Sequence, residues 1–273
     1  MRGLAEFIMK GRKQAIVVVL LLGLIPMLNL LSPVIVGLVA LRKGLQEAGM
    51  VLVWAVLPLA AWAVAGDIVP LVMLFGITGL AWFLRETESW ELTLLASILV
   101  GVSIELYMRA QPELLNVVYA QFEAYLSAQD LQMVSLEQFR ATIPSFFGAV
   151  YMILAILLLM LARWMQAALY NPGGFQTEFH GLRIEKKVAA ALLAGMFIAT
   201  VVEFIPESWV FYMMMPLIFS GVALVHGLVG KRKASSMWLV AFYGVMPWMS
   251  QLIVMLALID SWYDFRSRGP NSA

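Results

Sequence analysis

The sequence predicts an all-α fold, a polytopic transmembrane helical bundle with seven full spans and a broken N-terminal helical hairpin. Two observations carry this prediction. The 273 residues are 62% hydrophobic and only 13% charged, whereas soluble domains are about 45–50% apolar and about 25% charged. A water-soluble fold of this size must be covered by polar groups, and this chain has too few of them. The apolar residues also gather in runs that are long enough to cross a bilayer.

The expected spans follow from the length of these runs. A helix that crosses a bilayer needs about 20 apolar residues, with about 17 as the lower limit. By this measure we expect membrane spans at residues 50–65, 68–84, 91–108, 143–163, 188–204, 208–229 and 237–259. Together with the segments between them they make a single membrane domain over residues 1–273.

The segment 14–41 is apolar throughout, but it is interrupted by Pro26, Asn29, Ser32 and Pro33. Proline removes a backbone donor and collides with the preceding helical turn, so one straight helix is not expected. Two interpretations remain for this segment. It forms either one kinked span or two short helices that build a hairpin and return to the starting side.

The placement of basic residues favours the hairpin. Lys and Arg accumulate in cytoplasmic loops. If the segment 14–41 returns, 14 of the 18 Lys and Arg residues share one side, against 10 if it crosses once. The basic residues then expected on the opposite side are Arg109, Arg140, Arg266 and Arg268. This arrangement predicts a multi-pass protein of the bacterial cytoplasmic (inner) membrane with a cytoplasmic N-terminus.

The segment 109–142 is expected to form external amphipathic helices. Pro112 suits the first position of a helix. After it, Leu115, Val118 and Phe122 repeat at helical spacing. Such helices either lie on the membrane surface or cap the bundle.

The segment 164–187 is expected to be a cytoplasmic loop that contains an interfacial helix. The string Asn171-Pro-Gly-Gly174 is a strong turn signal, because proline presets one dihedral angle and glycine accepts positive φ. Phe175, Phe179 and Leu182 then follow at spacings of four and three residues, which places them on one face of a helix.

These loop residues also carry a family resemblance. The strings Asn171-Pro-Gly-Gly-Phe175 and Glu178-Phe-His-Gly-Leu-Arg183, together with Ser135-Leu-Glu-Gln-Phe-Arg140, resemble the YybS-like family of bacterial polytopic membrane proteins. The resemblance extends over residues 16–259. That family is distantly similar to the substrate-binding S-components of energy-coupling-factor transporters. The resemblance therefore implies a compact helical bundle with a broken first segment, and it implies no catalytic residues.

Candidate functional residues are the few polar groups in or beside the predicted spans, because ionisable groups are costly in a bilayer. No catalytic motif and no cysteine is present, and neither a cofactor nor a metal site is expected. The candidates for ligand binding or another functional role are Asn29, Glu105, Arg163, Asn171, Gly173, Gly174, Glu178, His180, Arg183 and His226.

Each candidate also has an explanation without function. Glu105 and Arg109 are four residues apart and are expected to form a local ion pair. His226 falls at the level of the lipid headgroups. Glu178 and His180 do not share a helix face and do not match a zinc pattern. Arg163 has the position of an arginine that reaches toward lipid phosphate.

Three functions remain open. The first is a transporter-type membrane component that binds a small molecule, which the broken segment 14–41 favours. The second is a membrane scaffold without a ligand, which small-residue helix faces favour. The third is a membrane enzyme for a lipid or isoprenoid substrate, which requires Glu105, Arg163 and His226 to share one cleft. The lipid bilayer is the expected partner, another membrane subunit is left open, and the net charge of +1 gives no reason to expect nucleic acid.

Overall fold

A computed structural model describes residues 2–128, 136–202 and 205–266, and these ranges contain helices and no strand. The predicted all-α class is therefore confirmed. In chain order the elements, with η for a 3-10 helix, are α1 (Arg2–Met9), α2 (Arg12–Leu24), η1 (Leu28–Leu31), α3 (Ser32–Lys43), α4 (Leu45–Val64), α5 (Val69–Thr87), α6 (Trp90–Arg109), α7 (Pro112–Ala128), α8 (Leu136–Tyr170), α9 (Gly174–Gly181), α10 (Lys186–Val201), η2 (Glu207–Trp209), α11 (Val210–Lys231), α12 (Met237–Val245), η3 (Met246–Trp248) and α13 (Ser250–Tyr263).

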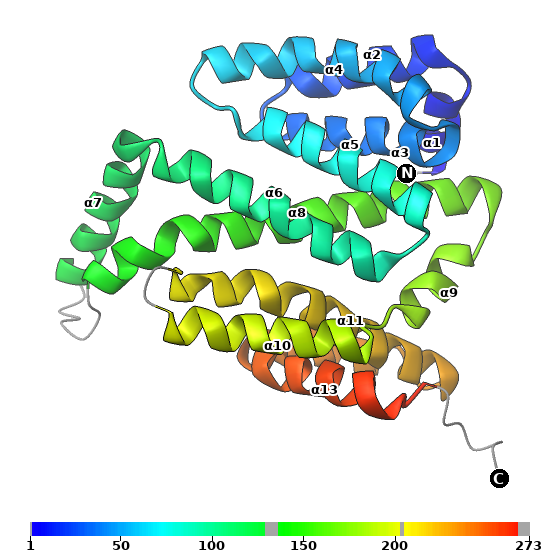
Figure 1. The fold of residues 1–273 in the computed structure, drawn as a ribbon. Coiled ribbons are helices and arrows are strands. Elements are labelled where there is room, and N and C mark those ends of the chain that lie inside the picture. Colours follow the sequence, from blue (N-terminus) through cyan, green and yellow to red (C-terminus); the bar gives the residue numbers. More distant parts are fainter. Residues whose placement is uncertain (1, 129–135, 203–204, 267–273) are drawn as a thin grey trace.

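Most of the long helices run roughly along one common direction (Figure 1). Helices α1 to α5 form one group, α6 and α8 lie in the middle, and α10, α11 and α13 form the opposite group. Helix α8 contacts α3 and α5 on one side and α11 on the other, and it packs along α6. The core is thus organised around α8, which connects the two outer groups.

The segment 14–41 is interrupted in the middle. Ile25 has extended backbone angles, as expected for the residue before Pro26, and it ends α2. Pro33 lies in the first turn of α3, where its missing N–H is harmless. Arg12 at the start of α2 donates from Nε to Glu47 Oε2 over 2.7 Å, and Glu47 lies just after α3. The segment therefore folds back, with both ends at the same end of the bundle.

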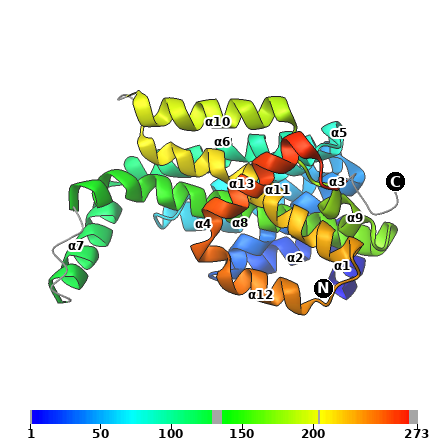
Figure 2. The same cartoon turned by 90° about the horizontal axis from the view of Figure 1, so that it is seen from below.

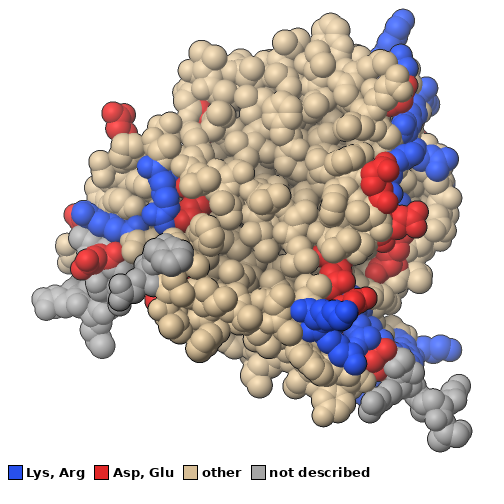
Figure 3. Space-filling view, viewed as in Figure 1, with Lys and Arg blue, Asp and Glu red and all other residues tan. Residues whose placement is uncertain are grey.

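Within the described ranges, five helical segments are long and apolar enough to cross a membrane. They are Leu45–Val64, Val69–Thr87, Trp90–Arg109, Phe139–Tyr170 and Glu207–Lys231. In the space-filling view, Lys, Arg, Asp and Glu gather at two opposite ends, and a broad belt between them is almost free of charge (Figure 3). A bundle of apolar helices that can cross a bilayer is therefore confirmed.

The predicted count of seven complete spans is not reproduced. Helix α10 has 16 residues, which corresponds to about 24 Å of helix against about 30 Å of hydrocarbon. The predicted span 237–259 is instead the pair of segments Met237–Trp248 and Ser250–Tyr263, which are bent by 111° at a break beside η3 and Pro247. The described chain therefore has five such helices, or six if this bent pair is one span.

The bent pair changes the predicted position of Arg266. Lys231 Nζ at the end of α11 donates to the backbone oxygen of Arg266 over 2.9 Å. The chain that leaves α11 thus returns to the same end of the bundle after α13. The prediction that Arg266 lies on the opposite side from Lys231 is wrong, because a proline-containing break turns the chain back. Arg268 lies outside the described residues.

The result is a strongly asymmetric distribution of basic residues. Of the 17 Lys and Arg residues in the described ranges, only Arg109 and Arg140 lie at the end that carries α7 (Figure 1). The other 15 lie at the opposite end, which we call the basic end. They are Arg2, Lys10, Arg12, Lys13, Arg42, Lys43, Arg85, Arg163, Arg183, Lys186, Lys187, Lys231, Arg232, Lys233 and Arg266.

At the other end, α7 and the start of α8 project from the bundle (Figure 2). The predicted segment 109–142 contains α7, whereas its last residues belong to the first turns of α8. Phe122 stacks on Phe139 with ring centroids 3.5 Å apart, and Arg140 pairs with Glu123 over 2.8 Å. Helix α8 has 35 residues, or about 52 Å of helix, which is longer than a bilayer core is thick.

The segment 164–187 contains more helix than the predicted loop. Helix α8 continues to Tyr170, and the turn after it leads into α9. Gly173 has φ of +85°, which glycine adopts without strain. Phe175 packs edge-on against Trp90, and Phe179 packs edge-on against the ring of His226. Helix α9 therefore lies against α6 and α11 at the basic end.

Candidate functional site

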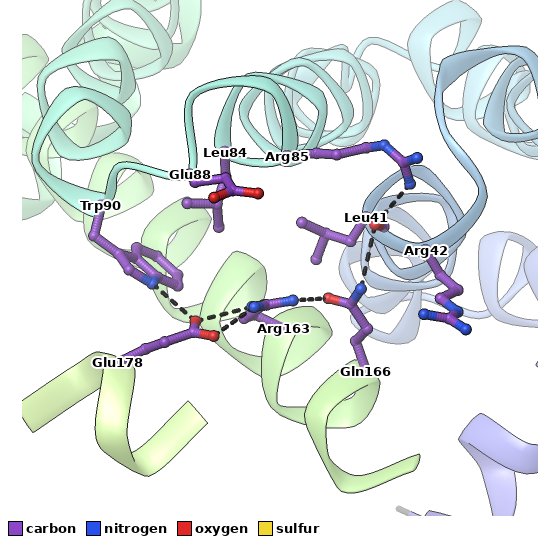
Figure 4. A pocket seen from close by; sticks show the side chains of 9 residues that line it. All are labelled: Leu41, Arg42, Leu84, Arg85, Glu88, Trp90, Arg163, Gln166 and Glu178. Carbon is purple, nitrogen blue, oxygen red and sulfur yellow. Dashed lines mark hydrogen bonds and ion pairs between the residues drawn. The ribbon is translucent and has the colours of Figure 1, made fainter. Parts of the chain in front are cut away.

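A polar pocket of about 590 Å³ opens at the basic end of the bundle (Figure 4). It is formed by the last turns of α3 and α5, the start of α6, the last part of α8, and α9. We call it the basic-end pocket. Its lining residues are Leu41, Arg42, Leu84, Arg85, Glu88, Trp90, Arg163, Gln166 and Glu178.

One wall of the pocket is the carboxyl end of α3. The last carbonyl groups of a helix have no partner within the helix and carry partial negative charge. Arg85 Nη1 donates to the carbonyl oxygen of Leu41 over 3.0 Å, and Gln166 Nε2 donates to the same oxygen over 3.2 Å. Two side chains from α5 and α8 thus hold the end of the returning hairpin at the pocket (Figure 4).

The opposite wall is an ion pair between α8 and α9. Arg163 Nε donates to Glu178 Oε2 over 2.9 Å, and Arg163 Nη2 donates to Oε1 of the same carboxylate. Trp90 Nε1 lies 3.4 Å from Glu178 Oε2, and Arg163 Nη1 donates to Gln166 Oε1. The guanidinium therefore donates two parallel hydrogen bonds to the carboxylate. This arrangement makes arginine selective for anions with two oxygens.

The charges of the pocket are not balanced. It contains three arginines and two glutamates. Among the described residues, no carboxylate lies within 4 Å of Arg42 or Arg85. Arg42 lies over the ring of Tyr170, 3.9 Å from its centroid, and Arg85 bonds only to backbone oxygens. The pocket therefore presents arginines whose positive charge is not fully balanced by the carboxylates that line it.

A second group of charges, which we call the C-terminal clasp, lies next to α9. Asp260 of α13 is fully buried and lies 3.2 Å from Arg266 Nε. Arg266 Nη1 donates to the backbone oxygen of His180 over 2.7 Å, and Arg183 pairs with Asp264 over 3.0 Å. Arg266 Nη2 also donates to the backbone oxygen of Ser220 in α11 over 3.1 Å, so these contacts fasten the end of α13 to α9 and α11.

Two predicted candidates, His180 and His226, meet beside the clasp. Their ring centroids are 6.3 Å apart, and His226 Nε2 is hydrogen-bonded to the hydroxyl of Tyr243 at 2.8 Å. Burial, and to a smaller degree the positive charge of Arg266, lowers the pKa of His180 below its usual range. In the described part of the chain, no group of three His, Asp or Glu residues could hold a metal ion.

The third cluster, which we call the Glu105 bracket, lies at the end that carries α7. Glu105 is only 2% exposed, and Arg109 Nη2 pairs with it over 2.7 Å, as the spacing predicts. The other donors to Glu105 come from α8, η2 and α11. They are Ser145 Oγ at 2.8 Å, Trp209 Nε1 at 3.0 Å and the Tyr212 hydroxyl at 2.8 Å.

Glycines bring the helices of the bracket close together. A Cβ atom at Gly148 would lie 2.6 Å from the backbone oxygen of Gly101 and would also collide with the Tyr212 hydroxyl. Helices α6, α8 and α11 therefore meet at this point because two positions have no side chain. The Glu105 bracket joins these three helices, with every oxygen of its buried carboxylate hydrogen-bonded.

The structure separates the predicted candidates into groups. Arg163 and Glu178 share the basic-end pocket, and His180, Arg183 and His226 lie at the clasp. Glu105 lies fifteen residues along α6 from Trp90, which is about 22 Å of helix. The enzymatic alternative requires Glu105, Arg163 and His226 to share one cleft. In the structure they lie in separate places.

The remaining candidates do not line the pocket. Asn29 is buried in η1 at the tip of the hairpin. Asn171 and Gly173 lie in the exposed turn before α9, and the side chain of Asn171 fills the space over Gly174, the first residue of α9. This turn sets the position of α9 and thereby the position of Glu178.

Sequence reasoning missed Arg42, Arg85, Trp90 and Gln166 as site residues. Only Gln166 had a local signal, because it follows Arg163 by three residues and so shares its helix face. The others come from the ends of separate helices, and their convergence depends on how these helices pack.

No protein-family model, no curated protein and no solved structure matches this chain. The function is therefore argued from the site itself.

Proposed function

We propose that this chain is a multi-pass protein of the bacterial cytoplasmic membrane that binds a small polar molecule in the basic-end pocket, as a transporter-type component. The orientation is supported by the described Lys and Arg residues, of which 15 lie at the end that holds the pocket and two at the other end. Because Lys and Arg accumulate on the cytoplasmic side of membranes, the pocket then opens to the cytoplasm and the N-terminus lies there too.

The observation that carries the proposed binding role is the pocket itself. Its volume of about 590 Å³ lies within the range of about 300–1,000 Å³ that is typical of ligand sites. Polar groups from α3, α5, α8 and α9 converge on it, and one of its walls is the carboxyl end of a helix that follows a break. Interrupted helices that present backbone groups to a cavity are a common way to build solute sites in transporters.

The similarity to the YybS-like family, and through it to transporter S-components, is part of this proposal. It agrees with a membrane component that binds a solute and obtains energy from a separate subunit. The similarity acts here as an analogy at the level of the fold, and the pocket remains the physical argument.

A topology experiment tests the orientation directly. The chain has no cysteine, so a single introduced thiol reports its own side of the membrane. We expect Ser127→Cys on α7 to react with a membrane-impermeant maleimide in intact spheroplasts. Ser235→Cys, which lies between α11 and α12, should react only after permeabilisation. The reverse pattern would contradict the proposed orientation.

A binding experiment tests the role of the pocket. The full chain is extracted gently into nanodiscs and its bound molecules are identified by native mass spectrometry. We expect a small molecule that is retained by the natural chain and by Arg232→Gln, and lost from Arg85→Gln. Arg232 is an exposed arginine at the same end, outside this pocket. A chain that retains a stable protein partner and no small molecule would instead support the scaffold function.

The scaffold function is kept as the second candidate because of one observation on α10. Ala190, Ala191 and Ala194 all lie on the exposed side of this helix, beside exposed Phe197. Small residues on a lipid-facing surface let another helix approach closely. We propose no catalytic step, since the ionisable candidates do not converge.

A further inference from the structure

Three N–H groups in the basic-end pocket converge on one carboxylate that belongs to the protein itself. Arg163 contributes Nε and Nη2, and Trp90 contributes Nε1. Glu178 supplies both oxygens. The contacts of the Glu178 carboxylate indicate the chemical group that this part of the pocket can hold. That group is a planar or tetrahedral anion with at least two oxygens.

The helix that carries Glu178 is held at this wall by the bonds of Glu178 and by Phe175, which packs edge-on against Trp90. Helix α9 has eight residues, and none of them is buried. One of its ends is fastened by the bond from Arg266 to the His180 carbonyl. Among the described side chains of α9, Glu178 provides the hydrogen bonds to the pocket wall. The Arg163 and Glu178 side chains are 27% and 30% exposed, so water and solutes can reach the pair.

A partly exposed ion pair of this kind can be displaced. Water and solutes compete for both partners of an accessible pair, which weakens its net contribution to stability. Displacement would leave Arg163 together with Arg42 and Arg85, and the only carboxylate left among the lining residues would be Glu88. The site would then carry a clear excess of positive charge for an incoming anion.

The remaining lining residues suit the rest of such a ligand. Leu41, Leu84 and the indole of Trp90 provide apolar surface beside the arginines. A molecule with an anionic head and a small apolar body would match both parts of the pocket. A free solute and a lipid headgroup share this chemistry.

From these contacts we propose that the ligand carries a carboxylate or phosphate group that replaces Glu178 on Arg163 and Trp90, which releases α9 from the pocket wall. Glu178 thus occupies the anion position of the unliganded protein. This inference rests on the proposed function, because it assigns a ligand class to the same pocket.

The experiment compares the natural chain with Glu178→Gln in nanodiscs. Probes are inorganic phosphate, glycerol 3-phosphate and hexanoate in discs of phosphatidylcholine, and discs that contain phosphatidylglycerol without added probe. Binding is measured by calorimetry, and the release of α9 by hydrogen exchange of its amides. The matched control is Glu86→Gln, because Glu86 is an exposed carboxylate of α5 that does not line the pocket.

We expect Glu178→Gln to bind the anionic probe about fivefold more tightly than the natural chain, the factor that corresponds to an ion pair of roughly 1 kcal/mol. Its α9 amides should exchange faster even without a probe, and Glu86→Gln should behave like the natural chain. Arg163→Gln should lose binding. Because Glu178→Gln gains affinity, the result does not depend on whether Arg163→Gln folds.

The outcomes separate the two proposals. Binding of a free anion in phosphatidylcholine discs identifies a solute, and faster exchange of α9 only in phosphatidylglycerol discs identifies a lipid headgroup. Both results support the inference. If a molecule co-purifies in the pocket but Glu178→Gln changes neither anion affinity nor α9 exchange, the inference is overturned while the proposed function stands. If no molecule is retained and no probe binds, both are overturned.

Discussion

The two ends of the bundle each hold a carboxylate bound to an arginine, but they differ in how completely the charge is satisfied. Glu105 is 2% exposed and accepts hydrogen bonds from four side chains on four different helical segments. Glu178 is about a third exposed, faces a cavity and has two further arginines near it, for which the described residues provide no carboxylate within 4 Å. A completely satisfied buried charge fixes packing, whereas an accessible and unbalanced cluster has capacity left for a ligand.

The largest loss of stability among the predicted variants is expected at the Glu105 bracket. Glu105→Leu should lower the free energy of unfolding by about 3 kcal/mol, because it removes the carboxylate that accepts from the buried hydroxyl groups of Ser145 and Tyr212 and pairs with Arg109. Thermal unfolding in detergent measures this change. Glu113→Leu, at an exposed position of α7, is the control. Equal effects of the two substitutions would show that the bracket does not stabilise the bundle.

A smaller loss of stability is expected at the C-terminal clasp when the pH is lowered. The pKa of His180 is lowered in the folded chain, while in the unfolded chain it is about 6.5. The unfolded state then binds the proton more readily, so stability is complete above pH 6.5 and falls as the pH decreases through the folded pKa. Unfolding transitions recorded between pH 8 and pH 5 test this.

The control for the clasp is His180→Gln, which cannot take up a proton. Its stability should depend less on pH over the same interval than that of the natural chain. His226 lies beside His180 on α11, so His226→Gln is measured in parallel to separate the two rings. An unchanged pH profile in His180→Gln would refute the assignment to His180.

The smallest change in stability is expected at the basic-end pocket. Arg85 is exposed, and within the described part of the chain it bonds to backbone oxygens alone, so Arg85→Gln should alter the free energy of unfolding by less than about 1 kcal/mol. Its binding of an anionic probe should nevertheless weaken by about tenfold, since one guanidinium of the site is lost. A large loss of stability would place Arg85 with Glu105 as a packing residue and would remove the contrast between the two ends.

Much of the helical fold could be predicted from apolar runs. The helices at residues 45–64, 69–87, 90–109 and the long α8 follow from stretches of hydrophobic residues that are bounded by charges or prolines. The turn at residues 171–173 follows from its proline and glycines. The return of the chain at Pro247 was not predicted, because the run 237–259 has the composition of a span and a single proline often only kinks a membrane helix.

The candidate site could be predicted only in part. Arg163 and Glu178 stood out individually, but their pairing depends on the angle at which the turn directs α9 across the end of α8. Arg42 and Arg85 entered the sequence argument only as basic charges. Trp209 and Tyr212 had no signal for contact with Glu105, because periodicity assigns a residue to a face of its helix and does not name the neighbour across from it.

The length of α8 has a practical consequence. About 20 Å of this helix exceed the thickness of a bilayer core, and the stacked rings of Phe122 and Phe139 brace α7 against it. A membrane protein of 30.3 kDa is otherwise hard to orient in electron micrographs, because the detergent belt hides its contours. The braced pair offers an epitope for a nanobody, and thus a rigid fiducial for particle alignment that leaves the basic end untouched.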